Sequence, residues 1–469
     1  MKKLLSFSTV ILIILFSVFP CSSFEAEDIQ PVGDSDAYLV GDANANGEIE
    51  IIDVTVISRY IAGFSVSVID LDAADSDTDG SLSIIDATII QRYLAEIDAY
   101  ATYYVGVYNY VVDEGKRVAE KVSQRKNADT VSFIAFSDAH YHADTKEIID
   151  GITHAGQGMD IIISSADIDF AAVLGDNGWQ DSSTSLDEGL RQIQATNDLI
   201  ASGMEKTANL RVPGNHCSQI GAYYTNRDYH RNADLYPYYG AYNTQAVFDE
   251  ENRRRGYCYQ DFSEHKLRVI CLNTSDLEDI KPANLESHDI SAEQLKWFCS
   301  ALDMSKKADA AKWQILILSH APLDWSDNTM PASVILNAYA SGSQGSVTKN
   351  DTEIRYDFSR SRRAAVIGQV HGHIHDYKVD NLRYIDNDGQ TRIGGISRIA
   401  VPNACNGRDN EYKYAPHEYL DIDFADEVSY HKTVGTGKDT SFTVFTVDLA
   451  ARKVYADCYG AGIDRVISY

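Results

Sequence analysis

The chain has 469 residues and a formal net charge of −28, and 44% of its residues are hydrophobic. This length exceeds that of one ordinary domain, so we expect at least two folded units with ample apolar residues for their cores. The negative charge excludes nucleic acid as a general partner, because a phosphate backbone is repelled by an acidic surface.

The first residues have the pattern of a signal peptide. Lys2 and Lys3 form a basic start, residues 4–19 are continuously apolar, and small residues stand at 22 and 23. This order predicts a signal peptide at 1–23, a short acidic linker at 24–36, and a secreted, extracellular protein. A retained anchor, or a lipoprotein on Cys21, are the alternatives. Because the apolar stretch is short for a span of ~20 residues, we expect no membrane span after cleavage.

Two segments repeat with a period of 33 residues, Gly41 to Asp53 and Ala74 to Asp86. Each has oxygen-bearing side chains at alternate positions, then a glycine, and an aspartate at the start of a helical stretch. Ca²⁺ prefers six to eight oxygen ligands, and this spacing brings them around one ion. The repeat therefore predicts two Ca²⁺ sites. The candidate ligands are Asp42, Asn44, Asn46, Glu48 and Asp53 in the first loop, and Asp75, Asp77, Asp79, Ser81 and Asp86 in the second.

This repeat resembles a type I dockerin over residues 37–100. The resemblance implies a small all-α module with two EF-hand-like calcium loops. It also implies a partner, the cohesin domain of a scaffoldin, and a place in a cellulosome-like complex at the cell surface. Ile51–Ile52 and Ile84–Ile85 stand where docking specificity is read in this family, and their near-identity implies two pseudo-symmetric docking orientations. The alternative is that these isoleucines are core residues at the helix starts.

Residues 101–128 are expected to form a linker and a leading helix, around Val111 to Arg125, ahead of a larger domain at 129–469. In that domain, apolar runs of strand length each end in polar residues that can bind metal. Strand ends of an α/β sheet are where ligand sites usually form. The runs are Val131–Phe136, Ile168–Leu174, Leu210–Val212, Ile315–Leu318 and Ala364–Val370.

The polar groups follow in the order Asp-x-His, Gly-Asp, Gly-Asn-His, His and Gly-His-x-His. This order resembles the calcineurin-like metallophosphoesterases. The resemblance implies an α/β fold of the αββα type, a sandwich of two β-sheets flanked by helices, with two divalent or trivalent transition metals at one edge. Such ligands suit Mn, Fe or Zn. The implied ligands are Asp138, His140, Asp176 and His375 for metal one, and Asp176, Asn215, His320 and His373 for metal two.

This family hydrolyses phosphate mono- or diesters, because two cations activate a water and neutralise the phosphoryl oxygens. The resemblance makes His216 the catalytic residue that protonates or stabilises the leaving alkoxide. Family members usually have Asp or Glu after this histidine, whereas this chain has Cys217. That departure keeps a second hypothesis open, a non-catalytic or weakly active docked component that binds a ligand or glycan.

A third hypothesis, a glycosidase, needs two carboxylates flanking a sugar and fits the His-rich motifs poorly. A role in the breakdown of phosphorylated polysaccharide remains compatible with the phosphoesterase hypothesis.

Several other residues allow two interpretations each. Cys258 and Cys271 flank a predicted hairpin and either form a disulfide or remain buried thiols. Trp179 either lines the pocket or packs in the core. The tyrosine-rich stretch from Tyr223 to Tyr242 is either a stacking lid or an irregular surface segment. We expect His142 and His371, which neighbour the ligands, to pack beside the metals rather than bind them.

Overall fold

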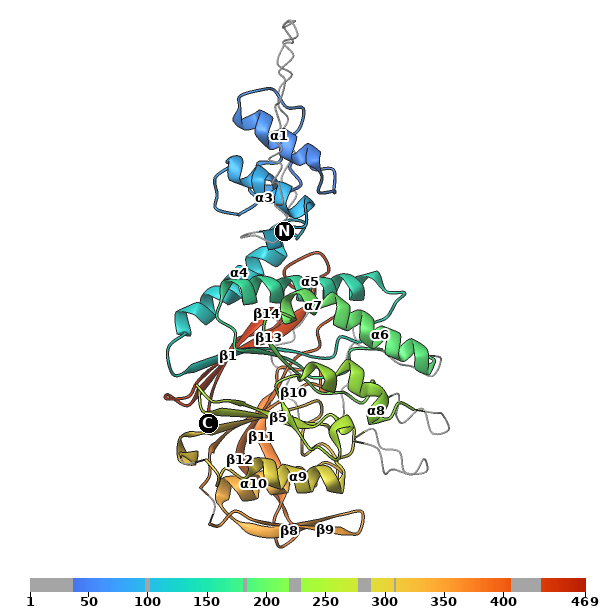
Figure 1. Cartoon of the computed structure of the whole chain (residues 1–469), viewed down its shortest axis with the longest axis vertical. Coiled ribbons are helices and arrows are strands. Elements are labelled where there is room, and N and C mark those ends of the chain that lie inside the picture. Colours follow the sequence, from blue (N-terminus) through green and yellow to red (C-terminus); the bar gives the residue numbers. More distant parts are fainter. Residues whose placement is uncertain are drawn as a thin grey trace, which may run out of the picture.

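The computed structural model describes residues 37–97, 102–179, 184–218, 229–276, 288–307, 309–360, 362–405 and 432–469. The expected signal peptide and acidic linker lie outside these residues, as do Tyr223 and Tyr224. Within the described ranges, no helix has the length and apolar character needed to cross a membrane. Figure 1 shows a small helical module at one end of a larger body built around two sheets.

The small module contains two matching helices, α1 (Ile51–Ile61) and α3 (Ile84–Leu94), with the short α2 (Leu71–Ala74) between them. Each long helix starts directly after one of the repeated loops. The first turn contains the last loop aspartate, which accepts a hydrogen bond from the main-chain N–H three residues earlier, at 2.8 Å for Asp53 and 2.7 Å for Asp86. The helix starts and the loop closures are therefore the same structural feature.

The isoleucine pairs at these helix starts are not core residues. The exposed fractions are 60% for Ile51, 50% for Ile52, 60% for Ile84 and 56% for Ile85. The interpretation of these residues as buried is therefore wrong, because the inward face of each helix is already filled by other apolar side chains. Both pairs remain available for a partner.

The module shares its packing with the larger body. The segment before the first loop pairs with the segment before α4 (Asn109–Arg125), with Val40 N–H donating to Val107 O at 3.0 Å. Val111 and Val112 of α4 are buried in the same apolar cluster as the helices of the module. The helix expected near 111–125 is thus α4, and it contacts the module at its start.

One side-chain contact ties α4 to only one of the two loops. Lys116 of α4 donates to the hydroxyl of Thr78, in the middle of the second loop. The equivalent position of the first loop is occupied by Ala45, which has no side-chain donor or acceptor. The two loops are therefore alike in sequence but unlike in their surroundings.

The larger body has two mixed sheets, confirming the predicted two-sheet sandwich. The first has the strand order β15 (Arg465–Ser468), β14 (Lys453–Gly460), β13 (Ser441–Asp448), β1 (Thr130–Phe136), β2 (Phe170–Val173) and β3 (Ala208–Arg211). The second has the order β11 (Val379–Ile385), β12 (Thr391–Ala400), β10 (Ala365–His371), β7 (Gln314–Ser319), β6 (Leu267–Leu272), β5 (Cys258–Phe262) and β4 (Val247–Phe248). The five predicted strand runs correspond to β1, β2, β3, β7 and β10.

Helices cover the outer face of each sheet (Figure 1). The first sheet is covered by α4, α5 (Lys146–Ser165), α6 (Leu186–Leu199) and α7 (Ala201–Met204). The second is covered by α9 (Ala292–Leu302) and α10 (Met330–Ser341). A separate hairpin, β8 (Gln344–Lys349) and β9 (Thr352–Asp357), and the short helix α8 (Asn232–Leu235) complete the described elements of regular structure longer than three residues.

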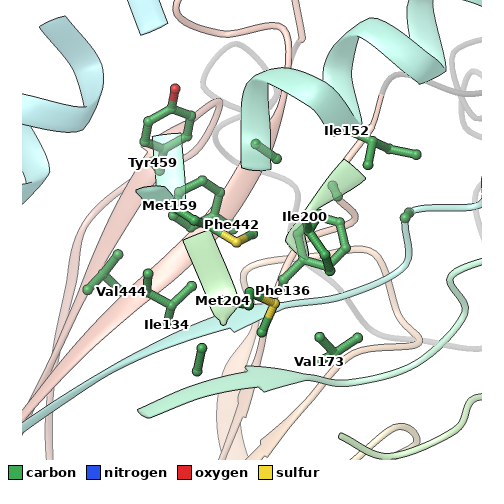
Figure 2. Close-up of a cluster of buried hydrophobic side chains, with 14 of the residues drawn as sticks. Ile134, Phe136, Ile152, Met159, Val173, Ile200, Met204, Phe442, Val444 and Tyr459 are labelled. Atoms are coloured by element: carbon green, nitrogen blue, oxygen red, sulfur yellow. The ribbon is translucent and has the colours of Figure 1, made fainter. Parts of the chain in front are cut away.

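Alternation along the strands creates three apolar layers. On β1, Phe133 and Ala135 face the other sheet, whereas Ile134 and Phe136 face the helices. Successive side chains of a strand point to opposite faces, so a strand buried on both sides is apolar throughout. Figure 2 shows the layer between the first sheet and its helices, in which Ile134 and Phe136 lie near α7.

Cys258 and Cys271 lie directly opposite each other on β5 and β6, and both are buried thiols. The described cysteines form no disulfide, so the structure agrees with the interpretation of these two residues as buried thiols. In the tyrosine-rich stretch, Tyr239 is buried and Tyr242 lies under the Arg211 guanidinium. These two tyrosines pack within the fold and do not form a lid.

We predict that Gly156→Ala destabilises the larger body. A Cβ at Gly156 on α5 would lie 2.3 Å from the carbonyl oxygen of Leu199, a main-chain atom that cannot move without shifting α6. Overpacking of this kind costs about 1–3 kcal/mol, which outweighs the helix propensity of alanine. Urea unfolding measures the change in free energy.

The matched control is Gly395→Ala, since a Cβ at Gly395 has no heavy atom within 4 Å. Equal stability of the two variants would contradict the close packing of α5 against the end of α6.

Candidate metal centre

The residues predicted as metal ligands follow the ends of strands that lie side by side. In the first sheet β1, β2 and β3 are parallel, and in the second sheet β7 and β10 are parallel. The carboxyl ends of parallel strands meet at one edge of a sheet. Because the two sheets pack face to face, both sets of strand ends meet at one edge of the sandwich. The ligand candidates are Asp138, His140, Asp176 and Asn215 from the first sheet, and His320, His373 and His375 from the second.

Most of these residues have a strained main chain. Positive φ angles occur at Asp138 (54°), His140 (47°), Asp176 (53°), His373 (71°) and His375 (54°). Non-glycine residues rarely adopt this left-handed conformation, which costs free energy and persists only where the surrounding structure imposes it. The strain allows successive side chains of one turn to converge on the same point.

The first group of side chains consists of Asp138, His140 and His375. The two imidazole Nε2 atoms lie 2.9 Å apart, and His375 Nε2 is 3.3 Å from Asp138 Oδ1. That buried oxygen accepts no well-aligned hydrogen bond from any described residue. Two imidazole nitrogens and one carboxylate oxygen thus lie close enough together to bind one cation.

The second group consists of Asp176, Asn215, His320 and His373. His320 Nδ1 donates to the carbonyl oxygen of Leu174 at 2.7 Å, which leaves Nε2 to face Asn215 Oδ1 at 2.9 Å and Asp176 Oδ2 at 3.0 Å. A neutral His320 would point a lone pair at two oxygens, so a proton or a cation must lie there. Ligand atoms of Asp176, His320 and His373 lie within 4.8 Å of one another.

Asp176 links the two groups. Its carboxylate also lies within 4.8 Å of ligand atoms of His140 and His216, on the side of the first group. Its Oδ1 accepts the main-chain N–H of His216 at 2.8 Å, which fixes the orientation of the carboxylate. Asp176 is therefore the residue through which the two groups meet.

The charge state of the centre is that of a cation site. Burial raises the pKa of the Asp176 carboxyl, but His320 and His216 outweigh it and hold that pKa well below its usual value. Burial lowers the pKa of His140 to about 4, and that of His373 far below its usual range. His320 is the exception, because Asp176 and Asp138 outweigh burial and raise its pKa. Metal ligands must be ionised carboxylates and neutral imidazoles, which is the state that these shifts favour for Asp176, His140 and His373, whereas His320 would release a proton when a cation binds.

The His216 ring lies at the rim of this centre. It is half-buried, its centroid is 4.9 Å from that of His140, and it stacks on Trp179 at 5.5 Å and 22°. The adjacent Cys217 points the other way. Its Sγ lies 2.8 Å from the Tyr239 hydroxyl and 3.9 Å from Asp176 Oδ1, within the apolar layer under α5 and α6. Burial and the nearby Asp176 raise the pKa of this thiol to about 12, so it stays protonated.

The two loops of the small module have the same internal hydrogen bonds. In the first loop, Asp42 Oδ2 accepts from Gly47 N at 2.7 Å. In the second, Asp75 Oδ2 accepts from Gly80 N at 2.7 Å. Position 4 has a positive φ of 55° in both loops. The position-12 aspartates close the loops by accepting from the N–H of position 3, Asp53 from Asn44 N at 3.1 Å and Asp86 from Asp77 N at 3.4 Å.

In the second loop, three of the candidate carboxylates lie close together. Ligand oxygens of Asp75, Asp77 and Asp86 lie within 4.8 Å of one another. Carboxylate and carbonyl oxygens around such a point suit Ca²⁺.

Comparison with protein families matches residues 131–377 to the calcineurin-like phosphoesterases, which is more than half of the chain. The chain belongs to this family. Residues 40–95 match the type I dockerin domain, so the chain joins a dockerin domain to a calcineurin-like phosphoesterase domain.

Among solved structures, the phosphoesterase is similar to the NAD nucleotidase of Haemophilus influenzae at 11% identity and a TM-score of 0.32. This match covers 72% of the present chain and 49% of that structure, so the chain spans about half of its length. A likeness at this level does not bear on activity. No curated protein matches the chain at a significant level.

Two residues beside the centre of the phosphoesterase were not found from the sequence. The buried His288 lies 4.4 Å from His373 between ring centroids, and Trp325 lies 4.5 Å from the same ring. His288 follows no strand end, so no signal marked it. Trp325 lies in the loop after β7, a few residues beyond His320, and this proximity was the available signal.

The two histidines that were expected to pack do not join the ligand groups. His371 is buried and its Nδ1 donates to Gly372 O at 2.8 Å. His142 is absent from every group of possible ligands among the described residues.

We predict that Cys217→Ser in the phosphoesterase lowers stability and leaves catalysis and metal content intact. The Sγ atom contacts Tyr239 and faces the apolar layer, so a hydroxyl there costs about 1 kcal/mol of folding free energy.

In contrast, Trp179→Leu removes the ring that stacks on His216 and should lower kcat with the metals retained. Thermal unfolding, metal analysis and steady-state kinetics on both variants measure these effects. A loss of more than about tenfold in kcat for Cys217→Ser at unchanged stability would show that the thiol acts on His216.

Proposed function

We propose that this protein is a secreted phosphoesterase that hydrolyses phosphate mono- or diesters at a two-metal centre and is docked through its dockerin onto a cohesin of a scaffoldin. The observation that carries the proposal is the position of Asp176. It lies between two sets of donor atoms, one formed with Asp138, His140 and His375, the other with Asn215, His320 and His373.

Each proposed metal would take ligands from both sheets. Asp138, His140, Asp176 and His375 would hold one metal, and Asp176, Asn215, His320 and His373 the other. When bound, a pair of Mn, Fe or Zn ions lowers the pKa of a water and neutralises charge on the phosphoryl oxygens. The main-chain N–H of His216 keeps the Asp176 carboxylate turned toward both sets.

His216 is the proposed general acid. Its ring is half-buried beside His140, where it can hold a proton at a ring nitrogen and deliver it to the departing alkoxide. Among the described residues, no side chain forms a hydrogen bond with this ring. The stacked Trp179 orients it instead, in the place of the carboxylate that other family members have after the histidine.

The alternative of a weakly active, ligand-binding component rested on Cys217. Because that thiol faces the interior and not the His216 ring, its presence does not argue against catalysis. A secreted location and membership of an extracellular multienzyme complex are part of the proposal, supported by the dockerin match. Phosphorylated polysaccharide is one compatible substrate.

We predict that the metal-loaded protein hydrolyses an aryl phosphate mono- or diester and that Asp176→Asn abolishes turnover. The substitution removes the only charge that both sets of ligands share. The matched control is Asp261→Asn. Asp261 lies on β5, outside the centre, and its Oδ1 pairs with Arg268 Nε at 2.7 Å. Release of the phenolate measures the rate with Mn²⁺. Failure of a well-folded protein with two bound metals to hydrolyse any phosphate ester would refute the proposal.

We predict that Asp53→Ala combined with Asp86→Ala abolishes calcium-dependent binding to a cohesin. Both carboxylates are fully buried and close their loops, so each loop loses a ligand and its internal hydrogen bonds. The control is Asp72→Ala, which removes an exposed carboxylate outside the loops. Calorimetry against a panel of type I cohesins, with and without a chelator, makes the comparison. Undiminished binding by the double variant would rule out calcium loops as the docking determinant.

A further inference from the structure

Trp325 is partly exposed to solvent and lies beside the candidate metal centre. Its exposed fraction is 38%, although its ring lies 4.5 Å from that of the proposed ligand His373, at an interplanar angle of 89°. His288 stands at 6.0 Å on the same side. A large aromatic side chain left partly in water next to a catalytic centre has apolar surface that a bound molecule could cover.

The loop on which Trp325 stands is held in place just before it. The carboxylate of Asp324 is fully buried and accepts from Arg383 N and Nε, at 2.9 and 3.0 Å, and from Arg398 Nη1 at 2.6 Å. Two arginines from β11 and β12 thus fix the residue directly before the tryptophan. Their guanidinium groups are charged, and bonds of this kind are stronger than neutral ones.

The loop is also held just after Trp325. Lys349, at the end of β8, is buried and donates to Asn328 O at 3.2 Å and Asn328 Oδ1 at 3.1 Å. The same ammonium group pairs with Asp289, the neighbour of His288. A single buried lysine therefore anchors both segments that flank His373. The exposed ring is presented in one orientation and loses little conformational freedom when a ligand covers it.

We propose that Trp325 is a stacking platform that makes this centre selective for phosphate esters with a planar aromatic group, such as a nucleobase. This inference rests on the proposed phosphoesterase function and names its substrate class. The phosphate occupies the metal centre, and the planar group of the same small ester covers the exposed face of Trp325.

The surroundings of Trp325 favour an aromatic group over a sugar. Sugar recognition needs donors and acceptors for several hydroxyls, and the polar side chains that clamp the loop, Asp324 and Asn328, are engaged by Arg383, Arg398 and Lys349. The ring neighbours of Trp325 are the imidazoles of His288 and His373. A flat π-surface stacks on an indole regardless of its hydrogen-bonding pattern, and such contacts contribute substantially to the binding of bases.

A purely structural role for Trp325 predicts different behaviour. If the indole only supports the His373 ring, its removal weakens metal binding and slows every substrate alike. If it is a platform, its removal acts on the aromatic part of the substrate and leaves the metal content unchanged. The two roles therefore separate in a comparison of two substrates that share the same reacting group.

The test compares adenosine 5′-monophosphate with ribose 5-phosphate. Both esters leave through a primary alkoxide at C5 of ribose, and they differ at C1, which holds adenine in the first and a hydroxyl in the second. The full chain is assayed with Mn²⁺, as wild type, Trp325→Leu and Trp325→Phe. For an enzyme that accepts only diesters, the corresponding methyl diesters take their place. Metal content and thermal stability are measured on each variant.

We expect the wild type to prefer the nucleotide in kcat/KM and Trp325→Leu to reduce that preference about tenfold, chiefly through KM, with Trp325→Phe retaining most of it. An equal loss for both substrates, a fall in metal content, or an unchanged preference in Trp325→Leu would overturn the platform. Hydrolysis of other phosphate esters without any preference for the base would overturn the platform but not the proposed function. Failure to hydrolyse any phosphate ester would overturn both.

Discussion

The structure depends on one contact between the two sheets, that of Asp176 with His320. Asp176 follows β2 of the first sheet, and His320 follows β7 of the second, with Oδ2 and Nε2 at 3.0 Å. His320 also donates from Nδ1 to the main chain at Leu174, at the end of β2. The face-to-face packing of the sheets therefore brings the candidate ligands of both sheets together. Any change that slides one sheet along the other separates the ligands.

The convergence of both sheets on one site explains why main-chain strain is concentrated at the candidate ligands. Five of the ligand candidates have left-handed main chains, which the packed layers on both sides of each sheet hold in place. We infer that the apolar layers, which bury far more side chains than the centre does, supply the free energy that offsets this strain. In the dockerin, the carboxylates of the two loops also repel one another, and bound cations would offset that repulsion.

The sequence was sufficient to predict which side chains gather at the edge of the sandwich, because apolar runs followed by Asp, Asn or His mark strand ends directly. The two repeated loops were predictable for a similar reason, since their residues are close in the chain. The role of these side chains as metal and calcium ligands stays a proposal. It could not predict the contribution of Trp325 or His288, which depends on contacts between segments far apart in sequence. It also could not predict the direction of Cys217, because a side chain beside His216 can face the site or the interior, and only the position of Tyr239 decides between them.

The central claim is that Asp176 stands between two transition metals. Anomalous diffraction from crystals of the full chain, recorded at the absorption edges of Mn, Fe and Zn, tests it most directly. The account predicts two peaks at the edge of the sandwich, one on each side of the Asp176 carboxylate, in addition to the calcium of the dockerin. A single peak in an active enzyme, or two peaks that Asp176 does not separate, would contradict it.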